Sequence, residues 1–248
     1  MASYNDFALF YDRLMKDVDY KKRSEYILNL FKKHGKMPTL LLDLACGTGN
    51  FSNQMALKGI EVIGVDMSED MLSAARENSC ELGTDLLYLC QKGSELDLYG
   101  TVDGAICCMD SLNHITDIKE LEKTLKRVSL FMEEDSLFIF DLNTIYKHEQ
   151  VLANNTFVIE DEEVFCVWQN RYDKQSRTTE ITLDFFAAEG EAYFRYGEEF
   201  CEKAYTDEEI IGLLEKAGLE LVAIYDDMTE SPVRMDSERA VFVAKKKK

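Results

Sequence analysis

The chain has 248 residues, of which 46% are hydrophobic and 30% charged, and its formal net charge is −19. It contains only two prolines and no run of about 18 apolar residues, so the composition predicts a globular protein and argues against a membrane-spanning helix. The strong negative charge would repel polyanions, which disfavours a broad nucleic-acid-binding surface.

The cysteines and the amino terminus both indicate the cytoplasm. The seven cysteines show no Cys-x-x-Cys pairing, which favours reduced thiols and no metal site. The first six residues lack a basic segment followed by an apolar one, so no signal peptide is expected. These features predict a cytoplasmic protein.

Residues 1–36 are expected to form a helical cap at the amino terminus. Aromatic and apolar residues recur along residues 4–20 with the spacing of an amphipathic segment, and Tyr11 and Tyr20 are among them. Such a segment needs a neighbour on which to bury its apolar side.

The next segment joins an apolar strand to a glycine turn. Residues 40–50 read Leu-Leu-Leu-Asp-Leu-Ala-Cys-Gly-Thr-Gly-Asn, so the turn holds Gly47 and Gly49 where a helix should begin. A second apolar run over 62–65 ends in Asp66, which places a carboxylate at the tip of the neighbouring strand. That carboxylate can accept both ribose hydroxyls of a nucleotide-like ligand.

Residues around the turn help to distinguish between nucleotides. A dinucleotide fingerprint has a third small residue, glycine or alanine, at the position where this chain has Ser52, so the fingerprint is incomplete. The Gly-Lys-Ser/Thr ending of an NTPase loop is also absent. Asp43 argues against a phosphate and suits a ligand with an ammonium and a sulfonium group. These features favour S-adenosylmethionine (SAM), and they weaken the alternative of a nicotinamide-dependent oxidoreductase.

The rest of the chain alternates strands and helices, which predicts an α/β fold with a mostly parallel sheet and helices on both faces. Ligands of such sheets bind at the carboxyl ends of the strands. Helices are predicted at 50–58, 68–79 with Ser68 as N-cap, 117–132, and from the capping box at 206–209 to Gly218. Strands are predicted at 40–44, 61–66, 86–90, 102–109, 136–142, 219–226 and 240–244.

Between residues 147 and 203 the pattern changes to strand-like alternation, which predicts an antiparallel insertion. Strands are expected at 164–172, 177–186 and 192–201, with a turn at 173–176. Because this insertion follows the fifth strand, it can cover the cleft as a lid. Its 13 acidic and 6 basic residues would favour an amine or another cation as substrate, although solvated loops such as 160–163 also explain such charge.

These motifs resemble the class I SAM-dependent methyltransferases, and in particular a bacterial group of small-molecule methyltransferases with an antiparallel lid. The first family motif, acidic-x-small-x-Gly-x-Gly, is matched by Asp43, Ala45, Gly47 and Gly49. The likeness covers nearly the whole chain. It implies a seven-stranded Rossmann-like domain over residues 37–146 and 204–248, with the last strand inserted antiparallel, and a lid over 147–203.

The resemblance also implies which residues bind SAM and its product, S-adenosylhomocysteine. These residues come from the cap, the glycine turn and the strand ends: Tyr11, Tyr20, Arg23, Asp43, Ala45, Cys46, Gly47, Gly49, Asp66, Met67, Gln91, Lys92, Gly93, Met109 and Asp110. The family commonly has an acidic residue after the third strand that holds the adenine amino group. Here that place reads Gln91-Lys92-Gly93-Ser94, which leaves adenine to Gln91, to backbone groups or to Glu95.

Methyl transfer is an in-line displacement at a sulfonium methyl group, so neither a covalent enzyme intermediate nor a metal ion is required. His114 is the candidate general base, because the unperturbed pKa of histidine lies near neutrality, and Tyr11 is a second catalytic candidate. A role in capping or in the site wall is an equal interpretation of His114. Many relatives carry a histidine in the lid's last strand where this chain has Phe200, which leaves His114, a tyrosine or no base at all.

The sequence therefore predicts an enzyme that transfers the methyl group of SAM to a nitrogen or oxygen nucleophile of a small molecule. It would act as a monomer or a homodimer. Two further hypotheses stay open: an RNA or protein methyltransferase that acts with a partner, and a SAM-binding module without catalytic activity.

Overall fold

The computed structural model describes residues 5–160, 164–190 and 192–248. The first four residues of the expected cap and residues 161–163 of the acidic loop lie outside this part of the chain. Within it, no helix is long and apolar enough to cross a membrane. The elements are α1 (Asn5–Leu14), α2 (Tyr20–His34), β1 (Leu40–Leu44), α3 (Asn50–Ala56), β2 (Glu61–Asp66), α4 (Glu69–Leu82), β3 (Leu87–Cys90), η1 (Gly93–Glu95), β4 (Val102–Cys107), η2 (Ser111–His114), α5 (Ile118–Phe131), β5 (Met132–Asn143), η3 (Lys147–Leu152), β6 (Thr156–Glu160), β7 (Val164–Asp173), β8 (Thr178–Glu189), β9 (Ala192–Lys203), α6 (Asp207–Lys216), β10 (Leu219–Asp226) and β11 (Arg239–Lys246).

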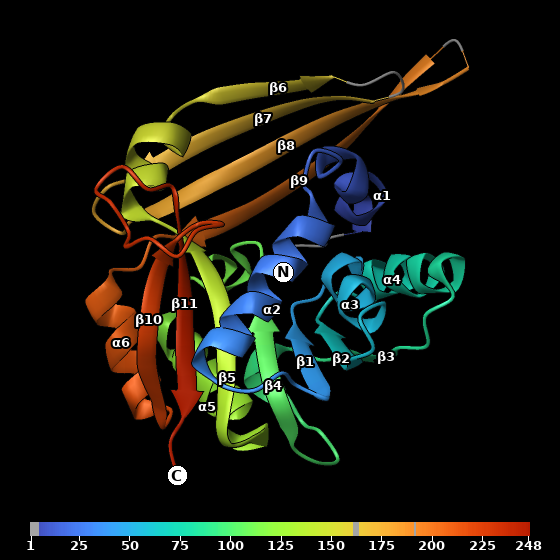
Figure 1. Cartoon of the computed structure of the whole chain (residues 1–248). Helices are drawn as coiled ribbons and strands as arrows, with labels where there is room; N and C mark the ends of the chain where they lie inside the picture. Colours follow the sequence, from blue (N-terminus) through green and yellow to red (C-terminus); the bar gives the residue numbers. More distant parts are fainter. Residues whose placement is uncertain (1–4, 161–163, 191) are drawn as a thin grey trace.

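Seven strands form the main sheet in the order β10-β11-β5-β4-β1-β2-β3 (Figure 1). β1 lies at the centre and pairs in parallel with β2 and β4, while β11 is antiparallel to both β5 and β10. The prediction of a Rossmann-like, mostly parallel sheet with an antiparallel strand inserted near one edge is therefore confirmed. Ser68 and Thr206 cap α4 and α6 as predicted.

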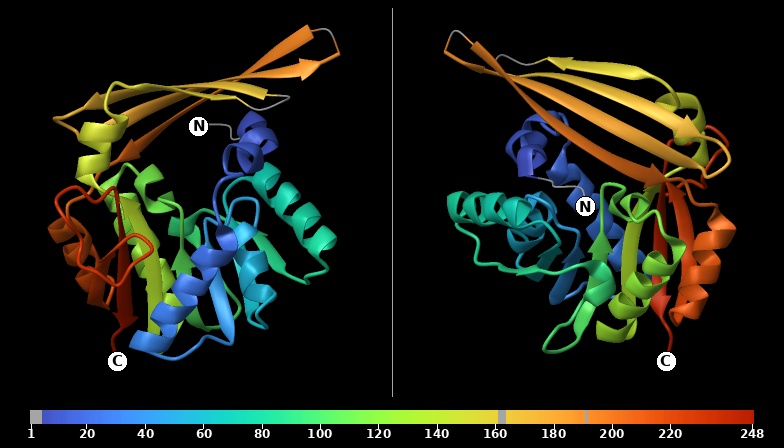
Figure 2. Two further views of the ribbon diagram at one scale, coloured as in Figure 1. Left: turned by 45° about the horizontal axis from the view of Figure 1, so that its top comes forward. Right: turned by 180° about the vertical axis from the view of Figure 1, so that it is seen from behind.

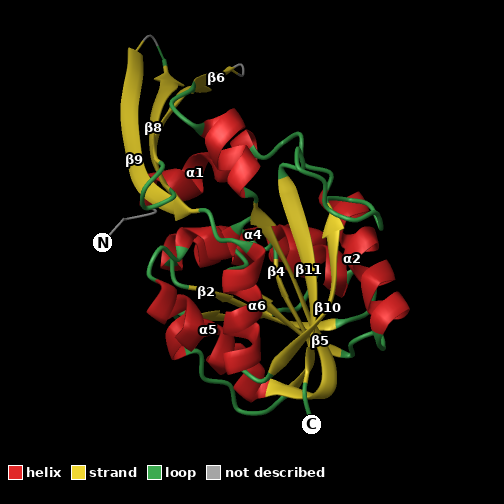
Figure 3. Cartoon of the chain, turned by 90° about the vertical axis from the view of Figure 1, so that its left-hand side faces the viewer, coloured by secondary structure: helices red, strands yellow, loops and turns green. Residues whose placement is uncertain are grey.

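Alternate residues of the central strands point to opposite faces of the main sheet, and helices cover both faces (Figure 3). On one face, Leu42 and Leu44 of β1 join a buried cluster with residues of α5 and α6. On the other face, Leu41 joins a buried cluster with residues of α2 and α3. This double cover explains why β1 reads as a nearly continuous apolar run.

The insertion forms a second, antiparallel sheet in the order β6-β7-β8-β9. The predicted antiparallel insertion and its turn between β7 and β8 are confirmed, and β6 is a strand that the prediction lacked. Its apolar residues Phe157, Val158 and Ile159 are consecutive, so the segment shows no alternation of polar and apolar residues.

Figures 1 and 2 show the second sheet lying across the carboxyl ends of the parallel strands, with α1 beneath it. Phe10 of α1 stacks on Phe185 of β8 with ring centroids 4.8 Å apart and also contacts Tyr196 of β9. The amino-terminal helix is thus packed between the second sheet and α4.

Candidate active site

A hollow of about 320 Å³, partly open to solvent, lies at the carboxyl ends of β1 and β4. It is lined by residues of the amino-terminal segment, the glycine turn and the loop after β4: Tyr11, Tyr20, Asp43, Ala45, Cys46, Gly47, Thr48, Asn50, Phe51, Cys108, Met109 and Ser111. This is the place where ligands of open α/β sheets bind.

The glycine turn has a left-handed backbone conformation that most residues avoid. Gly47 and Gly49 have φ angles of 54° and 75°, and Ala45 before them has a φ angle of 55°. A Cβ atom at Gly49 would lie 2.4 Å from the Tyr88 hydroxyl oxygen, so both backbone conformation and packing require glycine there. Ala45 adopts the left-handed conformation at a cost that the surrounding structure must offset.

Asp66 at the end of β2 is fixed beside this turn by backbone amides. Its Oδ2 accepts a hydrogen bond of 2.9 Å from the Gly47 amide, and its Oδ1 accepts one of 2.9 Å from the Ser68 amide. Burial raises the pKa of Asp66, and these amide bonds oppose the shift. A carboxylate can accept about four hydrogen bonds, so both oxygens can still accept bonds from a ligand's hydroxyl groups.

Asp43 is a buried carboxyl group at the floor of the hollow. It is 2% exposed and accepts a 2.5 Å hydrogen bond from the Ser52 hydroxyl. Burial raises the pKa of Asp43 to about 7. A positively charged ligand group beside it would lower that pKa again, so the site is suited to a cation.

Tyr11 and Tyr20 cover the hollow from the amino-terminal side. Burial raises the pKa of Tyr20 to about 12 and that of Tyr11 well above its ordinary value. Both phenols are therefore neutral near pH 7 and act there as hydrogen-bond donors or acceptors.

The loop after β4 is held by a buried ionic network. The Asp141 carboxylate accepts hydrogen bonds of 2.8 and 2.9 Å from the amides of Met109 and Asp110, which have φ angles of 60° and 52°. Arg239 of β11 donates a hydrogen bond to Asp141 and lies 2.6 Å from Asp110. Although burial acts in the opposite direction, the Arg239 guanidinium keeps the pKa of Asp110 well below its usual range.

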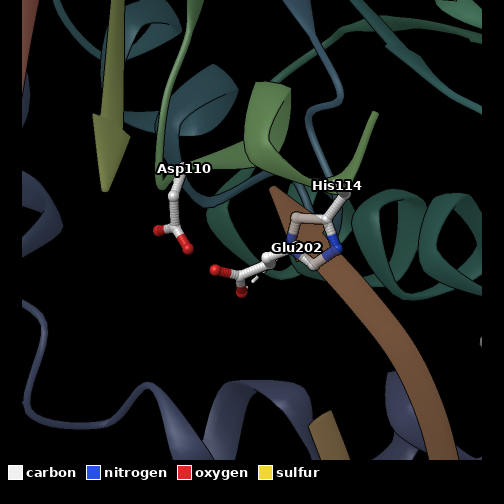
Figure 4. A group of neighbouring side chains, drawn as sticks. All are labelled: Asp110, His114 and Glu202. Atoms are coloured by element: carbon white, nitrogen blue, oxygen red, sulfur yellow. Dashed lines mark ion pairs between the residues drawn. The ribbon is translucent and has the colours of Figure 1, made fainter. Parts of the chain in front are cut away.

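Asp110, His114 and Glu202 converge from η2 and β9 (Figure 4). The His114 Nε2 atom lies 3.8 Å from Glu202 Oε1. The side-chain nitrogen of Asn143 donates hydrogen bonds to both Asp110 (2.8 Å) and Glu202 (3.2 Å). Facing atoms of the three residues lie within 4.8 Å of one another, a spacing at which they could share a metal ion. Arg239 beside Asp110 disfavours a divalent cation there by Coulomb repulsion.

Comparison with known proteins agrees with this geometry. A family model described as a methyltransferase domain matches residues 41–134. The methyltransferase-family protein YqeM of Bacillus subtilis (strain 168) is 32% identical over 246 residues, which cover 99% of this chain and 98% of YqeM. A crystal structure of a SAM-dependent methyltransferase from Clostridium acetobutylicum ATCC 824 superposes with a TM-score of 0.89 at 36% identity, covering 99% of both chains. The chain belongs to the SAM-dependent methyltransferases.

The fold of this SAM-dependent methyltransferase also occurs in more distant proteins. The sugar N-methyltransferase KedS8 from Streptoalloteichus sp. ATCC 53650 superposes with a TM-score of 0.80 at 19% identity, covering 98% of this chain and 93% of KedS8. At that identity the likeness concerns the fold alone.

Within this methyltransferase, the hollow brings together many of the predicted cofactor residues. Tyr11, Tyr20, Asp43, Ala45, Cys46, Gly47 and Met109 line it. Gly49 and Asp66 hold the glycine turn, Asp110 lies between the lining residues Met109 and Ser111, and Met67 is 58% exposed beside Asp66. Their roles in binding SAM stay predictions.

Other predicted cofactor residues have partners elsewhere. Arg23 forms a two-bond ion pair with Asp227, at 3.0 and 2.8 Å, and lines a neighbouring hollow of about 210 Å³. Lys92 pairs with Glu120 at 2.9 Å. The Gln91 side-chain amide forms hydrogen bonds with the backbone of Asp97, and Gly93 packs against Thr124 of α5 and Leu44 of β1.

Sequence reasoning missed Glu202 and His148, two buried residues beside His114. The alternation of β9 places Glu198, Phe200 and Glu202 on one face, and both glutamates are 4% exposed. The phenyl ring of Phe200 stacks on His114 with centroids 5.0 Å apart. The available signal was two glutamates on one face of an alternating segment, but the sequence does not show that this face is buried.

Proposed function

We propose that this methyltransferase transfers the methyl group of SAM to a nitrogen or oxygen nucleophile of a small molecule in the cytoplasm. The observation that carries the proposal is the enclosed polar cluster beside the hollow. Asp110 lies between Met109 and Ser111, which line the hollow, and Glu202 faces Asp110 from the second sheet with 4% exposure. A site that is buried to this extent favours a small acceptor molecule over a residue of a folded RNA or protein.

Residues in the hollow and beside it fit the chemical groups of SAM. Asp43 offers a buried carboxylate to an ammonium group, and Asp66 offers carboxylate oxygens to ribose hydroxyls. When bound, SAM supplies an activated methyl group on a sulfonium. Tyr11 and Tyr20 would orient the reactants and exclude water, since their raised pKa values make them poor proton acceptors near pH 7.

The charge of the chain and a structural neighbour support a small acceptor. A net charge of −19 opposes binding to RNA, which would be the main alternative acceptor. KedS8, which shares the fold, is a sugar N-methyltransferase.

The test is a methyl-transfer assay with the purified full chain and SAM labelled in its methyl group. Acceptors would be sets of small amines, small alcohols, bulk tRNA and denatured protein, with S-adenosylhomocysteine release as a second measurement. We expect transfer to a small molecule and none to tRNA or protein. Transfer to tRNA or protein alone would overturn the proposal, and SAM binding with no transfer to any acceptor would favour a non-catalytic module.

A further inference from the structure

Glu202 stands at the end of β9, where the second sheet approaches the loop after β4. Its side chain is directed toward Asp110 and His114 (Figure 4) and is almost fully buried. A buried carboxylate has a function or a partner, because burying its charge alone is costly. The surroundings of Glu202 therefore show what it is placed to bind.

The nearby cations are engaged by other groups. Arg239 contacts Asp110 and Asp141, and the Lys147 ammonium donates a 2.9 Å hydrogen bond to the Asn143 side-chain oxygen. Among the residues that the structure describes, the ion-pair contacts of Glu202 are those to His114 and His148, at 3.8 and 3.7 Å. Both separations exceed a hydrogen bond.

His148 gives a second, independent sign that a ligand belongs here. Its side chain is 0% exposed, and its Nδ1 atom is 2.7 Å from the Thr179 hydroxyl. Its Nε2 atom is buried 3.7 Å from Glu202 Oε2 and has no hydrogen-bond partner among the described residues. Buried polar atoms are rarely left without partners, so this one points to a polar group absent from the chain itself.

The charge balance indicates a ligand with one positive charge. Asp110, Asp141 and Glu202 face Arg239 and Lys147, so carboxylates outnumber cations even before the exposed Glu238 near Lys147 is counted. A protonated amine would balance the excess. A divalent ion would meet the guanidinium held 2.6 Å from Asp110.

We propose that Glu202 binds the protonated amino group of the acceptor and takes its proton before methyl transfer. This inference rests on the proposed function and narrows its acceptor to a primary or secondary amine. An N–H bond of the ammonium breaks, its electron pair stays on nitrogen, and the proton bonds to a Glu202 oxygen. The nitrogen lone pair then forms the N–C bond while the C–S bond of SAM breaks and sulfur keeps that electron pair.

The proton on Glu202 has a route to solvent. The His114 ring lies 3.8 Å from Glu202, and its side chain is 26% exposed. Because this separation exceeds a hydrogen bond, His114 would receive the proton through one bridging water or after its ring moves closer, and it need not touch the acceptor. Burial, with Asp110 as the next cause, raises the pKa of Glu202, which makes its carboxylate a stronger proton acceptor than an exposed one.

The experiment compares the wild type with Glu202→Gln, Glu202→Asp and Glu199→Gln in the methyl-transfer assay. The amine probes are glucosamine, ethanolamine, glycine and spermidine, and each is matched by an alcohol without the amino group. Glu199 is the control because it lies on the exposed side of the same strand. SAM affinity is measured for every variant, so that misfolding is detected.

We expect transfer to at least one amine probe and to none of the alcohols. Glu202→Gln should lower kcat about 100-fold or more, which is the usual size of general-base catalysis, with SAM affinity unchanged. It should also move the acid limb, the fall in kcat on the acid side of the pH profile, to higher pH, because without Glu202 only acceptor molecules that are already free amines can react. Glu202→Asp should restore part of kcat and return the acid limb toward its wild-type pH, and Glu199→Gln should match the wild type.

Transfer to alcohols but to none of the amines would overturn the inference and leave the proposed function intact. A Glu202→Gln variant with unchanged kcat and pH profile would also overturn it. If Glu202→Gln loses SAM binding, Glu202→Asp provides the test instead. The acid limb of its pH profile must then lie near the wild-type pH for the inference to hold. No transfer to any probe would overturn both the inference and the proposed function.

Discussion

Asp12 of α1 and Thr48 of the glycine turn are joined by a 2.7 Å hydrogen bond, which the Thr48 hydroxyl donates to the Asp12 carboxylate. The same carboxylate accepts hydrogen bonds of 2.8 Å from the Asn50 side chain and 3.1 Å from the Asn78 side chain. One side chain thus attaches the amino-terminal helix to the turn and to α4. Because Tyr11, which lines the hollow, directly precedes Asp12 in the chain, Asp12 also helps to fix one wall of the hollow.

Replacing Asp12 with alanine should therefore loosen α1 and weaken cofactor binding. Hydrogen bonds to a charged group contribute about 1.5–3 kcal/mol each, so the loss of even one of the three that Asp12 accepts should weaken SAM affinity roughly 10-fold or more. Calorimetric titration would measure the affinity, and hydrogen exchange should speed up over residues 5–14. Asp17→Ala is the control, since Asp17 is an exposed residue of the neighbouring linker. Unchanged exchange in the Asp12 variant would show that this carboxylate does not hold α1.

The two glycines of the turn should respond differently to alanine. Gly47 and Gly49 both have positive φ angles, which cost an alanine about 1–2 kcal/mol. A Cβ at Gly47 would meet no atom within 4 Å, whereas one at Gly49 would lie 2.4 Å from the Tyr88 oxygen. We expect Gly49→Ala to lower the free energy of unfolding by about 1–3 kcal/mol more than Gly47→Ala. Urea unfolding of both variants would measure this, and equal losses would contradict the clash with Tyr88.

Asp66→Ala should weaken SAM binding more than it changes folding. The substitution removes the carboxylate that would accept ribose hydroxyls, and hydrogen bonds to a charged group contribute about 1.5–3 kcal/mol. We expect SAM affinity to fall roughly 10- to 100-fold in a calorimetric titration. Asp70→Ala, an exposed residue in the first turn of α4, is the matched control. Equal effects of the two substitutions would exclude Asp66 from the cofactor site.

Asp43 should make the stability of the ligand-free protein depend on pH. Burial raises its pKa to about 7 in the folded state, whereas an unfolded aspartate has a pKa near 3.8. The folded state therefore binds the extra proton, and its stability falls as the pH rises from about 4 through 7. Asp43→Asn should be more stable than the wild type at pH 8, and this difference should disappear near pH 4. Chemical unfolding at several pH values would measure it.

A control with the opposite sign is available in Asp103. Although burial acts against it, hydrogen bonds from the amides of Leu40 and Thr39 lower the pKa of Asp103. Its contribution to stability is therefore present above its unfolded pKa and is lost as the pH falls. Identical pH trends for Asp43→Asn and Asp103→Asn would contradict a buried, proton-binding Asp43.

Local patterns predicted the parts of this protein that are built from neighbouring segments. One strand-helix-strand unit contains Gly47, Gly49 and Asp66. Because β1 and β2 pair in parallel, the glycine turn after β1 lies beside Asp66 at the end of β2. The capping residues Ser68 and Thr206 were equally local. The sequence therefore predicted the sheet and the glycine turn in detail.

Contacts between distant segments could not be predicted in this way. Arg23 was predicted to bind SAM, and its pairing with Asp227, which lies 204 residues away, was not predicted. Glu202 meets Asn143 across 59 residues, and this contact depends on how the second sheet folds back over the first. Alternation along β9 shows which residues share a face, but it carries no information on what that face contacts.

Arg239 is expected to be the most sensitive residue of the ionic network. It contacts two buried carboxylates, Asp110 and Asp141, so Arg239→Ala would leave both without their cation. Breaking a buried pair in this way costs about 3–5 kcal/mol in the free energy of unfolding. Arg234→Ala should cost less, because the Arg234 side chain is 64% exposed in its ion pair with Asp226 and solvent screens its charge.

The loss of unfolding free energy in Arg239→Ala should become smaller as the pH falls. Without the guanidinium, burial would raise the folded-state pKa of Asp110, so the variant would gain stability relative to the wild type as the pH falls. The wild type keeps the contribution of Asp110 over this range, because the folded-state pKa of Asp110 is lowered and that contribution is lost only below the ordinary value of 3.8. Urea unfolding at pH 7 and pH 4.5 should therefore show a smaller difference at the lower pH. A difference that stays constant would mean that Arg239 stabilises the fold by packing rather than by charge.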